Sequence, residues 1–418
     1  MKKTPALLAL LVSATLAHGA FTFAENNDGL ILPPGFRAIV VAEKLKPLRN
    51  LTVAPNGDLY VKTREAGIYA LRDTDGDGKA DEIKEFGSGG GTGIALRGDW
   101  LYTSTDSNVF RYKLTPGELV PAGEPERIVR DLPNKRQHSA KALAFGADGR
   151  LYVEVGSPSN AYGGAKDRAL GAKGEDPTEF LKTHGGYWSF DADKPDQTQA
   201  DGHHFSTGHR HSTTIALHPV SRQLFVAVHG RDQLNTVAPD FYTAEDNAEN
   251  PSEVFHQLTD GTNLGWPFTY WDPRAKQRKL NPEYGGDGKK LAEAGKYPDP
   301  AIGFPAHWAP MQLAFYTGAQ FPAKYKNGGF LAFQGSWNRA PLPQKGYKVV
   351  FIPFNEKGLP TGEYEVFADN FAGKAELASP NDAAHRPNGV AVGPDGSLFI
   401  TDSQKGSIWR IVYTGETK

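Results

Sequence analysis

One pattern of apolar and polar residues recurs six times along this chain. Each copy is a short apolar strand, a turn, and a second strand that ends in an aromatic residue or Leu. Within a copy the residues alternate, as in Leu59-Tyr60-Val61, with the period of two that is typical of a β-strand. The copies span residues 51–60, 94–102, 143–152, 215–225, 313–330 and 390–399.

Three of the turns contain Asn-Gly or Asp-Gly, at Asn56-Gly57, Asp148-Gly149 and Asp395-Gly396. Such pairs supply the positive φ angle that a tight hairpin requires. The last aromatic residues of successive copies are separated by 42, 50, 73, 105 and 69 positions, whereas a four-stranded propeller blade takes about 40–50 residues. The pattern therefore predicts an all-β fold, a six-bladed β-propeller with long loop insertions.

The propeller is predicted to be one domain, residues 25–418, with insertions at 158–208, 236–265 and 268–310. Two separate β-sandwich domains would be the alternative, but they would not explain the recurring motif. Loops are where functional residues concentrate in such scaffolds.

The first 24 residues have the features of an export signal. Lys2 and Lys3 precede an apolar run at 6–17, and small residues follow, so that cleavage is expected after Ala20 or Ala24. The run is too short to span a bilayer, and a buried or anchoring helix is the weaker alternative. The sequence thus predicts a periplasmic or secreted protein with no membrane span.

Composition removes several classes of function. Lys plus Arg number 46 and Asp plus Glu 48, for a formal charge of −2, which does not suit a nucleic-acid binder. Cysteine is absent, which excludes disulfides, zinc-thiolate sites, a Cys nucleophile and C-x-x-C-H haem attachment.

An acidic loop carries the strongest local motif. Carboxylates stand at the first, third, fifth and ninth positions, with Gly at the sixth and a backbone carbonyl available at the seventh. The twelfth position is Lys84, so this is not an EF-hand, and the flanking segments are predicted to be strands. We expect a structural calcium rather than a solvated acidic turn, because four unneutralised carboxylates repel each other. The proposed ligands are Asp73, Asp75, Asp77, Lys79 (through its carbonyl) and Asp81.

Cations recur at the beginnings or ends of the predicted blade strands. In a propeller these strand ends converge on one face around the axis, so the cations would surround a central pocket and attract a small polyanion. They are Arg49, Lys141, Arg210, Arg231, Arg339 and Arg386. Twelve histidines are also present, four of them at 203–211, but their spacing matches no common zinc pattern.

Taken together, a series of motifs in order along the chain resembles the soluble PQQ-dependent sugar dehydrogenases, the glucose/sorbosone dehydrogenase-like propellers. The sorbosone dehydrogenase-like branch is the nearer match because of Gly-Arg-Asp-Gln-Leu and Gly-Ser-Trp-Asn-Arg. The motifs begin at Gln137, Gly156, Gly208, Gly230, Gly265, Gly335, Gly346 and Arg386.

The resemblance implies PQQ on the axial face, held by a second calcium. Arg210 matches the family arginine at the quinone, and Arg386 an arginine at a cofactor carboxylate. Gly230 and Arg231 fall where backbone carbonyls hold the cofactor calcium. Further cofactor-binding candidates are Arg49, His211, Trp337, Asn338 and Arg339.

His138 matches the family's catalytic base. A neutral imidazole can take the proton of a sugar hydroxyl while hydride passes to the quinone. The resemblance implies oxidation of an aldose or a sugar-derived aldehyde. Because the chain has no haem motif, a separate electron acceptor, a cytochrome or a quinone, is expected.

The chain departs from the glucose dehydrogenase pattern at three places. His211 replaces an Asn, Ser157 replaces an Asp, and the glycine-rich run 87–92 stands where a substrate-contacting amide is expected. The sugar-binding residues are therefore altered, and His211 is a candidate second base or cofactor contact.

Two other functions are open at this point. A calcium-dependent lactonase would use the same fold, but with an axial cation held by carboxylates and amides. A non-catalytic extracytoplasmic binding propeller would keep the fold without the chemistry.

Overall fold

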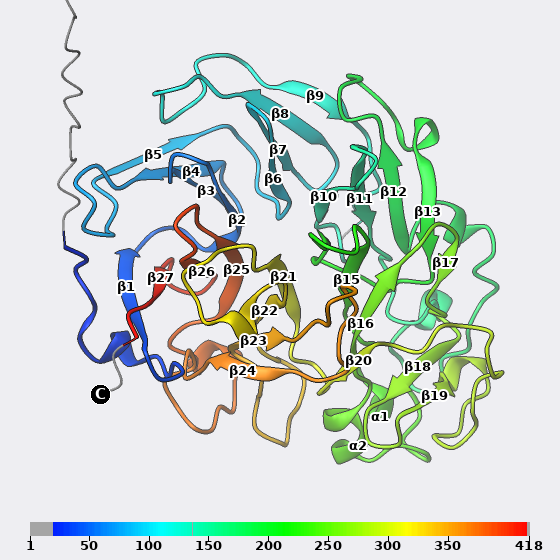
Figure 1. Ribbon diagram of the computed structural model, residues 1–418. Coiled ribbons are helices and arrows are strands. Elements are labelled where there is room, and N and C mark those ends of the chain that lie inside the picture. The colour runs from blue at the N-terminus through cyan, green and yellow to red at the C-terminus, as the bar shows by residue number, and fades with distance from the viewer. Residues whose placement is uncertain (1–19, 136, 416–418) are drawn as a thin grey trace, which may run out of the picture.

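The computed structural model describes residues 20–135 and 137–415, and six of the seven β-sheets that these form are arranged around an axis (Figure 1). The predicted six-bladed propeller is confirmed. Each copy of the sequence motif supplies the first two strands of one blade. Gly57, Gly149 and Gly396 have φ angles of 95°, 76° and 87°, as the hairpin turns required.

The blades follow one another in chain order. The first contains β2 (Leu48–Val53), β3 (Leu59–Thr63), β4 (Ile68–Arg72) and β5 (Glu82–Phe86). The second contains β6 (Ile94–Arg97), β7 (Trp100–Ser104), β8 (Val109–Lys113) and β9 (Glu126–Val129). The third contains β10 (Leu143–Phe145), β11 (Leu151–Val155), β12 (Gly186–Phe190) and β13 (His203–Thr207), with β17 (Thr262–Asn263) added at its edge.

The fourth blade contains β14 (Ala216–Leu217), β15 (Leu224–Val228), β16 (Glu253–Leu258) and β20 (Ile302–Phe304). The fifth contains β21 (Pro310–Phe315), β22 (Gly329–Phe333), β23 (Lys348–Ile352) and β24 (Glu365–Ala368). The sixth contains β25 (Pro387–Val392), β26 (Leu398–Asp402), β27 (Ile408–Tyr413) and, as its outer strand, β1 (Phe36–Ala42).

The sixth blade closes the ring with strands from both ends of the fold. β1 pairs antiparallel with β27, from Phe36 opposite Tyr413 to Ala42 opposite Ile408. The blue and red strands lie side by side in Figure 1. Because the first inner strand, β2, also contacts the last, β25, no blade is left with an unpaired neighbour.

The aromatic residue that ends each repeat, its marker, occupies the same position in every blade. Tyr60, on β3, is buried against the second blade, and Tyr102, on β7, against the third. The same holds around the ring, so that each marker fills the interface with the next blade. The remaining markers are Tyr152, Phe225, Phe330 and Phe399. The repeat spacing therefore reflects six equivalent apolar interfaces, and burial of these rings stabilises the closed ring.

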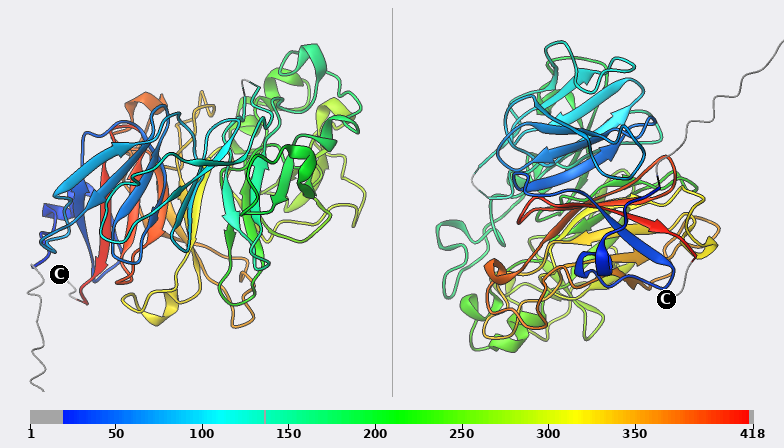
Figure 2. Two further views of the ribbon diagram at one scale, coloured as in Figure 1. Left: turned by 90° about the horizontal axis from the view of Figure 1, so that it is seen from above. Right: turned by 90° about the vertical axis from the view of Figure 1, so that its left-hand side faces the viewer.

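The insertions differ in extent from the predicted ranges. The range 158–208 contains β12 and β13, and 236–265 contains β16, so blade strands occur inside segments expected to be loops. The added structure is the hairpin of β18 (Thr269–Asp272) and β19 (Gln277–Leu280), and the helices α1 (Leu234–Val237) and α2 (Ala244–Glu249). The short 3-10 turns are Glu25–Gly29, Gly164–Lys166, Phe180–Lys182, Gln199–Asp201, Pro282–Tyr284, Ala323–Tyr325 and Pro380–Asp382. Figure 2 shows the long green connections extending past the ends of the strands.

The predicted export signal at 1–24 falls mostly outside the described residues. Of that segment, residues 20–24 are described, and Thr22 and Ala24 donate backbone hydrogen bonds to the carbonyls of Asp77 and Ala38 (both 2.8 Å). Among the described residues, no helix is long and apolar enough to cross a bilayer.

Candidate active site in the axial cavity

The candidate residues gather at one end of the blades because of strand direction. The first strand of each blade starts at this end, and the second strand returns to it. Arg386 comes just before β25 and Gly335 just after β22, while Arg210 precedes β14 and Gly230 follows β15. Residues from distant parts of the sequence are thereby brought to one face, as the propeller predicted.

A cavity of about 320 Å³ lies at this face, within the size range of small-molecule sites. Seven predicted site residues line it, namely His138, Arg210, His211, Gly230, Trp337, Asn338 and Arg386. Trp337 is 55% exposed at the rim. Residues without a role in the sequence-based prediction also line it, namely Gln137, Arg168, His229, Asp232, Glu253, His307, Ala309, Gln334 and Gly335.

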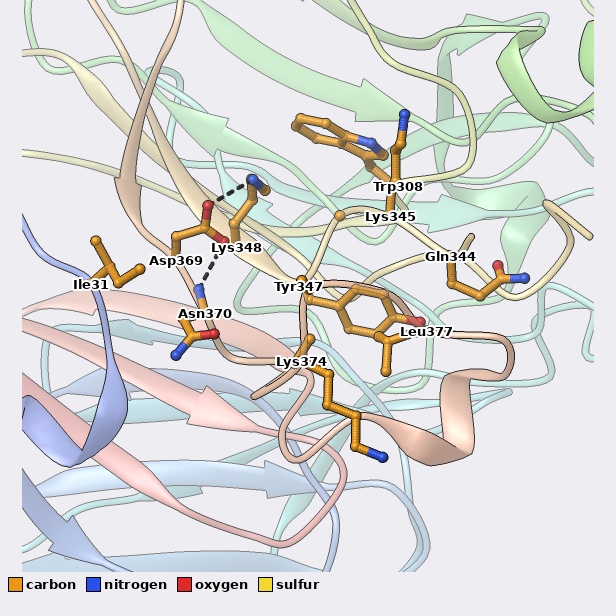
Figure 3. Close-up of a pocket in the computed structure, with 13 residues that line it drawn as sticks. Ile31, Trp308, Gln344, Lys345, Tyr347, Lys348, Asp369, Asn370, Lys374 and Leu377 are labelled. Atoms are coloured by element: carbon orange, nitrogen blue, oxygen red, sulfur yellow. Dashed lines mark hydrogen bonds and ion pairs between the residues drawn. The ribbon is translucent and has the colours of Figure 1, made fainter. Parts of the chain in front are cut away.

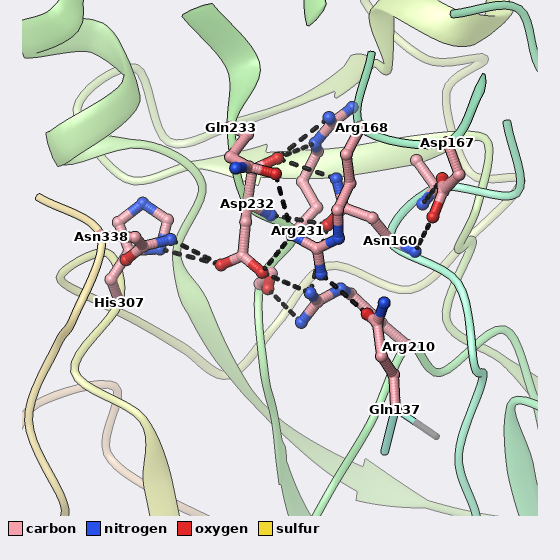
Figure 4. A network of polar contacts seen from close by, with 12 residues as sticks. Gln137, Asn160, Asp167, Arg168, Arg210, Arg231, Asp232, Gln233, His307 and Asn338 are labelled. Atoms are coloured by element: carbon pink, nitrogen blue, oxygen red, sulfur yellow. Dashed lines mark hydrogen bonds and ion pairs between the residues drawn. The ribbon is translucent and has the colours of Figure 1, made fainter. Parts of the chain in front are cut away.

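Asp232 is the centre of the polar network on one wall of the cavity (Figure 4). It accepts hydrogen bonds from Arg210 Nη2 (2.6 Å), Arg168 Nη1 (3.1 Å) and Asn338 Nδ2 (2.6 Å). Burial acts to raise the pKa of Asp232, but Arg210 and the other neighbouring cations outweigh it and lower the pKa to about 2. Asp232 therefore stays ionised and fixes Arg210 in the cavity wall.

Arg210 is also held by two other groups. Its Nη1 donates to the carbonyl of Gly230 (2.9 Å) and its Nη2 to Asn160 Oδ1 (3.1 Å). Its Nε is buried and has no partner within the described part of the chain. A buried donor without a partner is unusual in a folded protein.

Arg386 is anchored on the opposite side by backbone alone. Its Nε and Nη2 donate to the carbonyls of Gln334 (3.1 Å) and Gly335 (2.9 Å). Gly335 has a φ angle of +93°, and a Cβ there would lie 2.4 Å from the ring of Tyr347, so only glycine allows this arrangement. Within the described chain Arg386 has no ion-pair partner, and its Nη1 remains available for an anion.

Arg49 lies close to Arg386 but outside the lining of the cavity. Burial, followed by repulsion from Arg64 and Arg386, lowers the pKa of Arg49 to about 10. Lys62, on β3, is buried too, with its Nζ bonded to the carbonyl of Gly89 (2.8 Å), and burial lowers its pKa to about 8. This side of the axis therefore holds several cations without an ion-pair partner in the described chain, and the charge of Asp106 offsets only part of the lowering of the pKa of Arg49 and of Lys62.

Three imidazole rings form a row along the other wall. The rings of His138 and His211 stack at 4.8 Å, and those of His211 and His229 lie 5.2 Å apart. His138 Nδ1 is hydrogen-bonded to the carbonyl of Ser157, which can only accept, so Nδ1 carries the proton and Nε2 has the free lone pair. Burial and the charge of Arg210 lower the pKa of His138 well below its usual value and that of His211 to about 3, so both are neutral at pH 7.

Arg231 and Arg339 point their side chains elsewhere. Arg231 is paired with Glu283 (2.5 Å), and both side chains are fully buried. Arg339 is paired with Glu249 (2.5 Å) and also bonded to the carbonyl of Ala248. Both arginines hold insertions against the ring, so a direct contact of the Arg339 side chain with a cofactor has no support in this arrangement. The role predicted for Arg231 involves its backbone carbonyl and is independent of this side-chain position.

Sequence reasoning quoted Asp232 inside a motif but gave it no role, and it passed over Arg168 and Glu253 altogether. Arg168 lies on a long insertion after β11, with no repeat to place it. Glu253, the first residue of β16, accepts from the backbone N–H of Gly230 (3.0 Å), and burial raises its pKa to about 8. The one sequence signal for this group was the charge pair Arg231-Asp232 beside a strand end.

The acidic loop lies at the opposite end of the first blade. It joins β4 to β5, and the strands are paired up to Arg72 opposite Glu82, so the predicted hairpin setting is confirmed. Carboxylate oxygens of Asp73, Asp75 and Asp81 lie within 4.8 Å of one another. Asp77 instead accepts from the hydroxyl of Thr22 (3.0 Å).

A second cavity, of about 280 Å³, is lined by Ile31 and by segments that flank β21, β23 and β24 of the fifth blade (Figure 3). Trp308 and Tyr347 line it, and Lys348 crosses it to Asp369 (2.9 Å). The predicted site residues are not among those that line it. Tyr347 also packs behind Gly335, so this cavity borders the wall of the axial one.

The fold and the site together define a six-bladed propeller with a cation-rich axial cavity. A sequence model of the TrAA12-like family matches residues 30–414. The chain belongs to this family.

Among curated proteins, an uncharacterized protein of Borreliella burgdorferi (strain ATCC 35210 / DSM 4680 / CIP 102532 / B31) is 28% identical over 207 residues. The match covers 49% of this chain and 48% of that protein, so it spans about half the length of this relative.

Solved structures share the fold at low sequence identity. A calcium structure of Carbohydrate-Active Enzymes Family AA12 from Trichoderma reesei has a TM-score of 0.73 at 18% identity, covering 95% of this chain and 99% of that one. The holo form of the pyranose dehydrogenase PQQ domain from Coprinopsis cinerea has a TM-score of 0.72 at 18% identity, covering 94% and 98%. The PQQ-bound aldose sugar dehydrogenase of Streptomyces coelicolor has a TM-score of 0.57 at 17% identity, covering 91% and 99%. The family and fold predicted from the motifs are thus confirmed.

Proposed function

We propose that the protein is a PQQ-dependent oxidoreductase that oxidises an aldose or a sugar-derived aldehyde. The observation that carries this proposal is the half-buried guanidinium of Arg386, which lines the axial cavity without an ion-pair partner in the described chain. Burial and repulsion from Arg64 lower its pKa although Tyr347 and Asp402 act to raise it, and Arg49 lies near enough to repel it. Buried like charges are unfavourable unless an anion compensates them. PQQ carries several carboxylates and would provide that compensation.

The residues present fit this cofactor. Arg386 offers a free Nη1 from an anchored fork, and Arg210 has a buried Nε without a partner in the described chain. Asn338 also has a buried oxygen, Oδ1, without a partner there. Planar guanidinium groups held from behind are suited to carboxylates and carbonyls. Arg210, Arg386 and Asn338 would hold PQQ, with Trp337 at the rim.

A cofactor calcium is proposed at the same wall, where the Gly230 carbonyl accepts from Arg210 Nη1 (2.9 Å) and becomes available to a cation only when Arg210 moves away. The carbonyls of Gly230 and Arg231 are the proposed ligands, and carbonyl oxygen is a donor that calcium accepts. Glu253 holds the backbone of Gly230 through its N–H. That contact fixes the peptide between His229 and Gly230, which precedes the two proposed carbonyl ligands.

When bound, PQQ would supply an electrophilic quinone that accepts hydride. The chain's own part is to hold and deprotonate the substrate. His138 presents a neutral imidazole whose Nε2 can accept the proton of a sugar hydroxyl. Its depressed pKa keeps Nε2 unprotonated at physiological pH, and the hydrogen bond to Ser157 fixes the tautomer.

The lactonase alternative requires carboxylates and amides converging on an axial cation. In the described chain, the one group of three acidic or histidine residues close enough to share a metal is in the Asp73–Asp81 loop, at the other face. This favours the quinoprotein over the lactonase, because the axial cavity gathers arginines instead.

The deciding experiment compares two reactions of one preparation. Protein loaded with PQQ and calcium is expected to reduce an artificial dye with an aldose or a sugar-derived aldehyde as donor, and protein without PQQ is not. Lactone hydrolysis that needs calcium but no PQQ would establish the lactonase. Absence of both reactions, with no change in the quinone absorbance on mixing, would establish a binding propeller.

Three further proposals accompany this function. The export signal at 1–24 would take the protein to the periplasm or outside the cell. A cytochrome or a quinone would accept the electrons. The Asp73–Asp81 loop would hold a structural calcium through Asp73, Asp75 and Asp81, with Asp77 and the carbonyl of Lys79 completing the ligands.

A further inference from the structure

The side chain of Glu154, on β11, places a buried carboxyl group beside the histidine row. Its side chain is completely buried, and its Oε2 has no hydrogen-bond partner in the described chain. Its Oε1 accepts from the backbone N–H of Ser212 (3.2 Å) and lies 3.2 Å from His211 Nδ1. The charge of the buried Lys141 and the backbone N–H of Gly156 also favour the ionised group, yet Oε2 stays without a hydrogen bond, which is costly for a buried carboxyl group.

The contact determines which nitrogen of His211 carries the proton. When Glu154 is ionised, Oε1 can only accept, and the charge of Lys141 and the backbone N–H groups of Ser212 and Gly156 favour this form, whereas burial acts the other way and raises the pKa of Glu154 well above its usual value. The nitrogen that faces Oε1 must then be the donor, so His211 is the Nδ1–H tautomer with its lone pair on Nε2.

Glycine at position 156 allows the groups to converge. A Cβ there would lie 2.6 Å from the carbonyl oxygen of His138, 2.8 Å from Glu154 Oε1 and 2.9 Å from His211 Nδ1. Three groups from three strand ends therefore meet at one α-carbon. As a result, the Glu154 carboxyl group contacts His211, and the His211 ring stacks on that of His138.

We propose that Glu154 is a positioning residue that holds His211 as the Nδ1–H tautomer, so that the cavity offers two imidazole acceptors, His138 Nε2 and His211 Nε2, side by side. His138 and His211 stack at 4.8 Å and both line the cavity. Neither Nε2 is bonded to a group in the described chain. The substrate class that follows from this proposal rests on the proposed sugar oxidation.

Two acceptors in stacked rings suit two neighbouring hydroxyl groups. His138 would take the proton of the reacting hydroxyl, and His211 would accept a hydrogen bond from the hydroxyl on the adjacent carbon. The site would therefore select a vicinal diol, such as an aldose with its 2-hydroxyl group, over an isolated alcohol or a 2-deoxy sugar. Loss of one such hydrogen bond weakens binding by about three- to tenfold.

The first test needs neither cofactor nor activity. Long-range ¹H–¹⁵N spectra of the ¹⁵N-labelled apo-protein report the tautomer of each histidine, and His211→Gln assigns the His211 signals. His211 is expected to be Nδ1–H in the wild type and in Glu154→Gln, whose amide oxygen still accepts, and a mixture of tautomers in Glu154→Leu.

His218 is the internal control. Its Nδ1 accepts from the backbone N–H groups of Val220 and Ser221, so it is expected to remain the Nε2–H tautomer in every variant. An Nε2–H tautomer of His211 in the wild type overturns the proposal without any variant, which covers the case in which Glu154→Leu fails to fold. An unchanged Nδ1–H signal of His211 in Glu154→Leu would also overturn the proposal.

The second test uses the loaded enzyme with an aldose and its 2-deoxy analogue. The wild type is expected to show a KM about three- to tenfold lower for the aldose. Glu154→Leu should raise the KM for the aldose to that of the analogue and leave the KM for the analogue unchanged, whereas Glu154→Gln should retain most of the preference. Equal KM values in the wild type would overturn the diol selectivity, while absence of turnover with any sugar would contradict the proposed function and leave the tautomer result standing.

Discussion

The axial cavity and the Asp73–Asp81 loop lie at opposite ends of the blades, and they deal with like charges in opposite ways. In the loop, carboxylates crowd together at the surface, where backbone N–H groups satisfy them. Gly76 and Gly78, for example, donate to Asp73 (2.7 and 2.9 Å). At the axial end of the blades, Arg386 lines the cavity, while Arg49 and the buried Lys62 lie outside its lining, and none of the three has an ion-pair partner in the described chain.

The two regions therefore differ in how a bound ion of opposite charge would affect them. Exposed charges are screened by water, so a cation in the loop would add stability to a fold that already forms. Cations held inside the protein are screened less, so an anion that enters the cavity would stabilise those without an ion-pair partner. The loop is therefore expected to affect stability, and the cavity binding and turnover.

The largest effect is expected at the proposed base. His138→Ala removes the proton acceptor and should lower kcat of the PQQ-loaded enzyme by roughly a hundredfold or more, with PQQ affinity nearly unchanged. Steady-state kinetics with dye reduction, together with a PQQ titration, measure both. His203→Ala, at an exposed histidine bonded to Asp260, is the matched control. Turnover like that of the wild type in His138→Ala would reject the base.

Loss of an arginine in the cavity comes next. Arg210→Ala removes charge-assisted hydrogen bonds and should weaken PQQ binding by about ten- to a hundredfold. Arg127→Ala, which removes an exposed arginine paired with Asp196, should leave the affinity unchanged. An unaltered dissociation constant in Arg210→Ala would remove this residue from the cofactor site.

Calcium removal should separate the two regions. Asp73→Asn combined with Asp75→Asn should abolish a calcium-dependent gain in the free energy of unfolding, about 2–3 kcal/mol when calcium is at a hundred times its Kd. Denaturation with calcium and with chelator measures this gain. Kinetics at saturating PQQ and calcium should change little, and a loss of turnover without a loss of stability would assign the loop a different role.

The smallest effect is expected at Lys62, where substitution should increase the stability of the protein. Its pKa in the fold, about 8, lies below the value of about 10.4 in an unfolded chain, so the fold disfavours the charged form. This penalty is fully present below pH 8, and stability increases as pH rises from 8 to 10 because the unfolded chain then binds more protons. Lys62→Met should therefore raise the Tm of the apo-protein by about 2 °C at pH 7 and by less at pH 10. A gain that grows with pH would contradict the burial of a charge.

The fold was predictable because it repeats. Six aromatic residues, from Tyr60 to Phe399, occupy equivalent interfaces, and a repeated physical requirement leaves a repeated signal in the sequence. Each insertion occurs only once, so it leaves no repeated signal in the sequence. For that reason β12 and β13 fell inside a range predicted as loop.

In the candidate site, too, the residues beside repeated strands were predictable and the others were not. Arg210, Arg386 and His138 stand next to repeat strands, and the propeller alone brings them to one face. Asp232 and Glu154 act through partners more than twenty residues away, and their roles depend on contacts that only the folded chain reveals. Arg339 stands at an equivalent strand end, yet its side chain turns toward Glu249, because direction after a strand end is set by loop packing.

The central claim is that the axial cavity binds a small polycarboxylate cofactor. Calorimetric titration of the apo-protein with PQQ in the presence of calcium tests it most directly. The account predicts saturable binding of one PQQ per chain, weakened in both Arg210→Ala and Arg386→Ala but not in Arg127→Ala. Absence of binding to the wild type, or equal affinity in all four proteins, would contradict it.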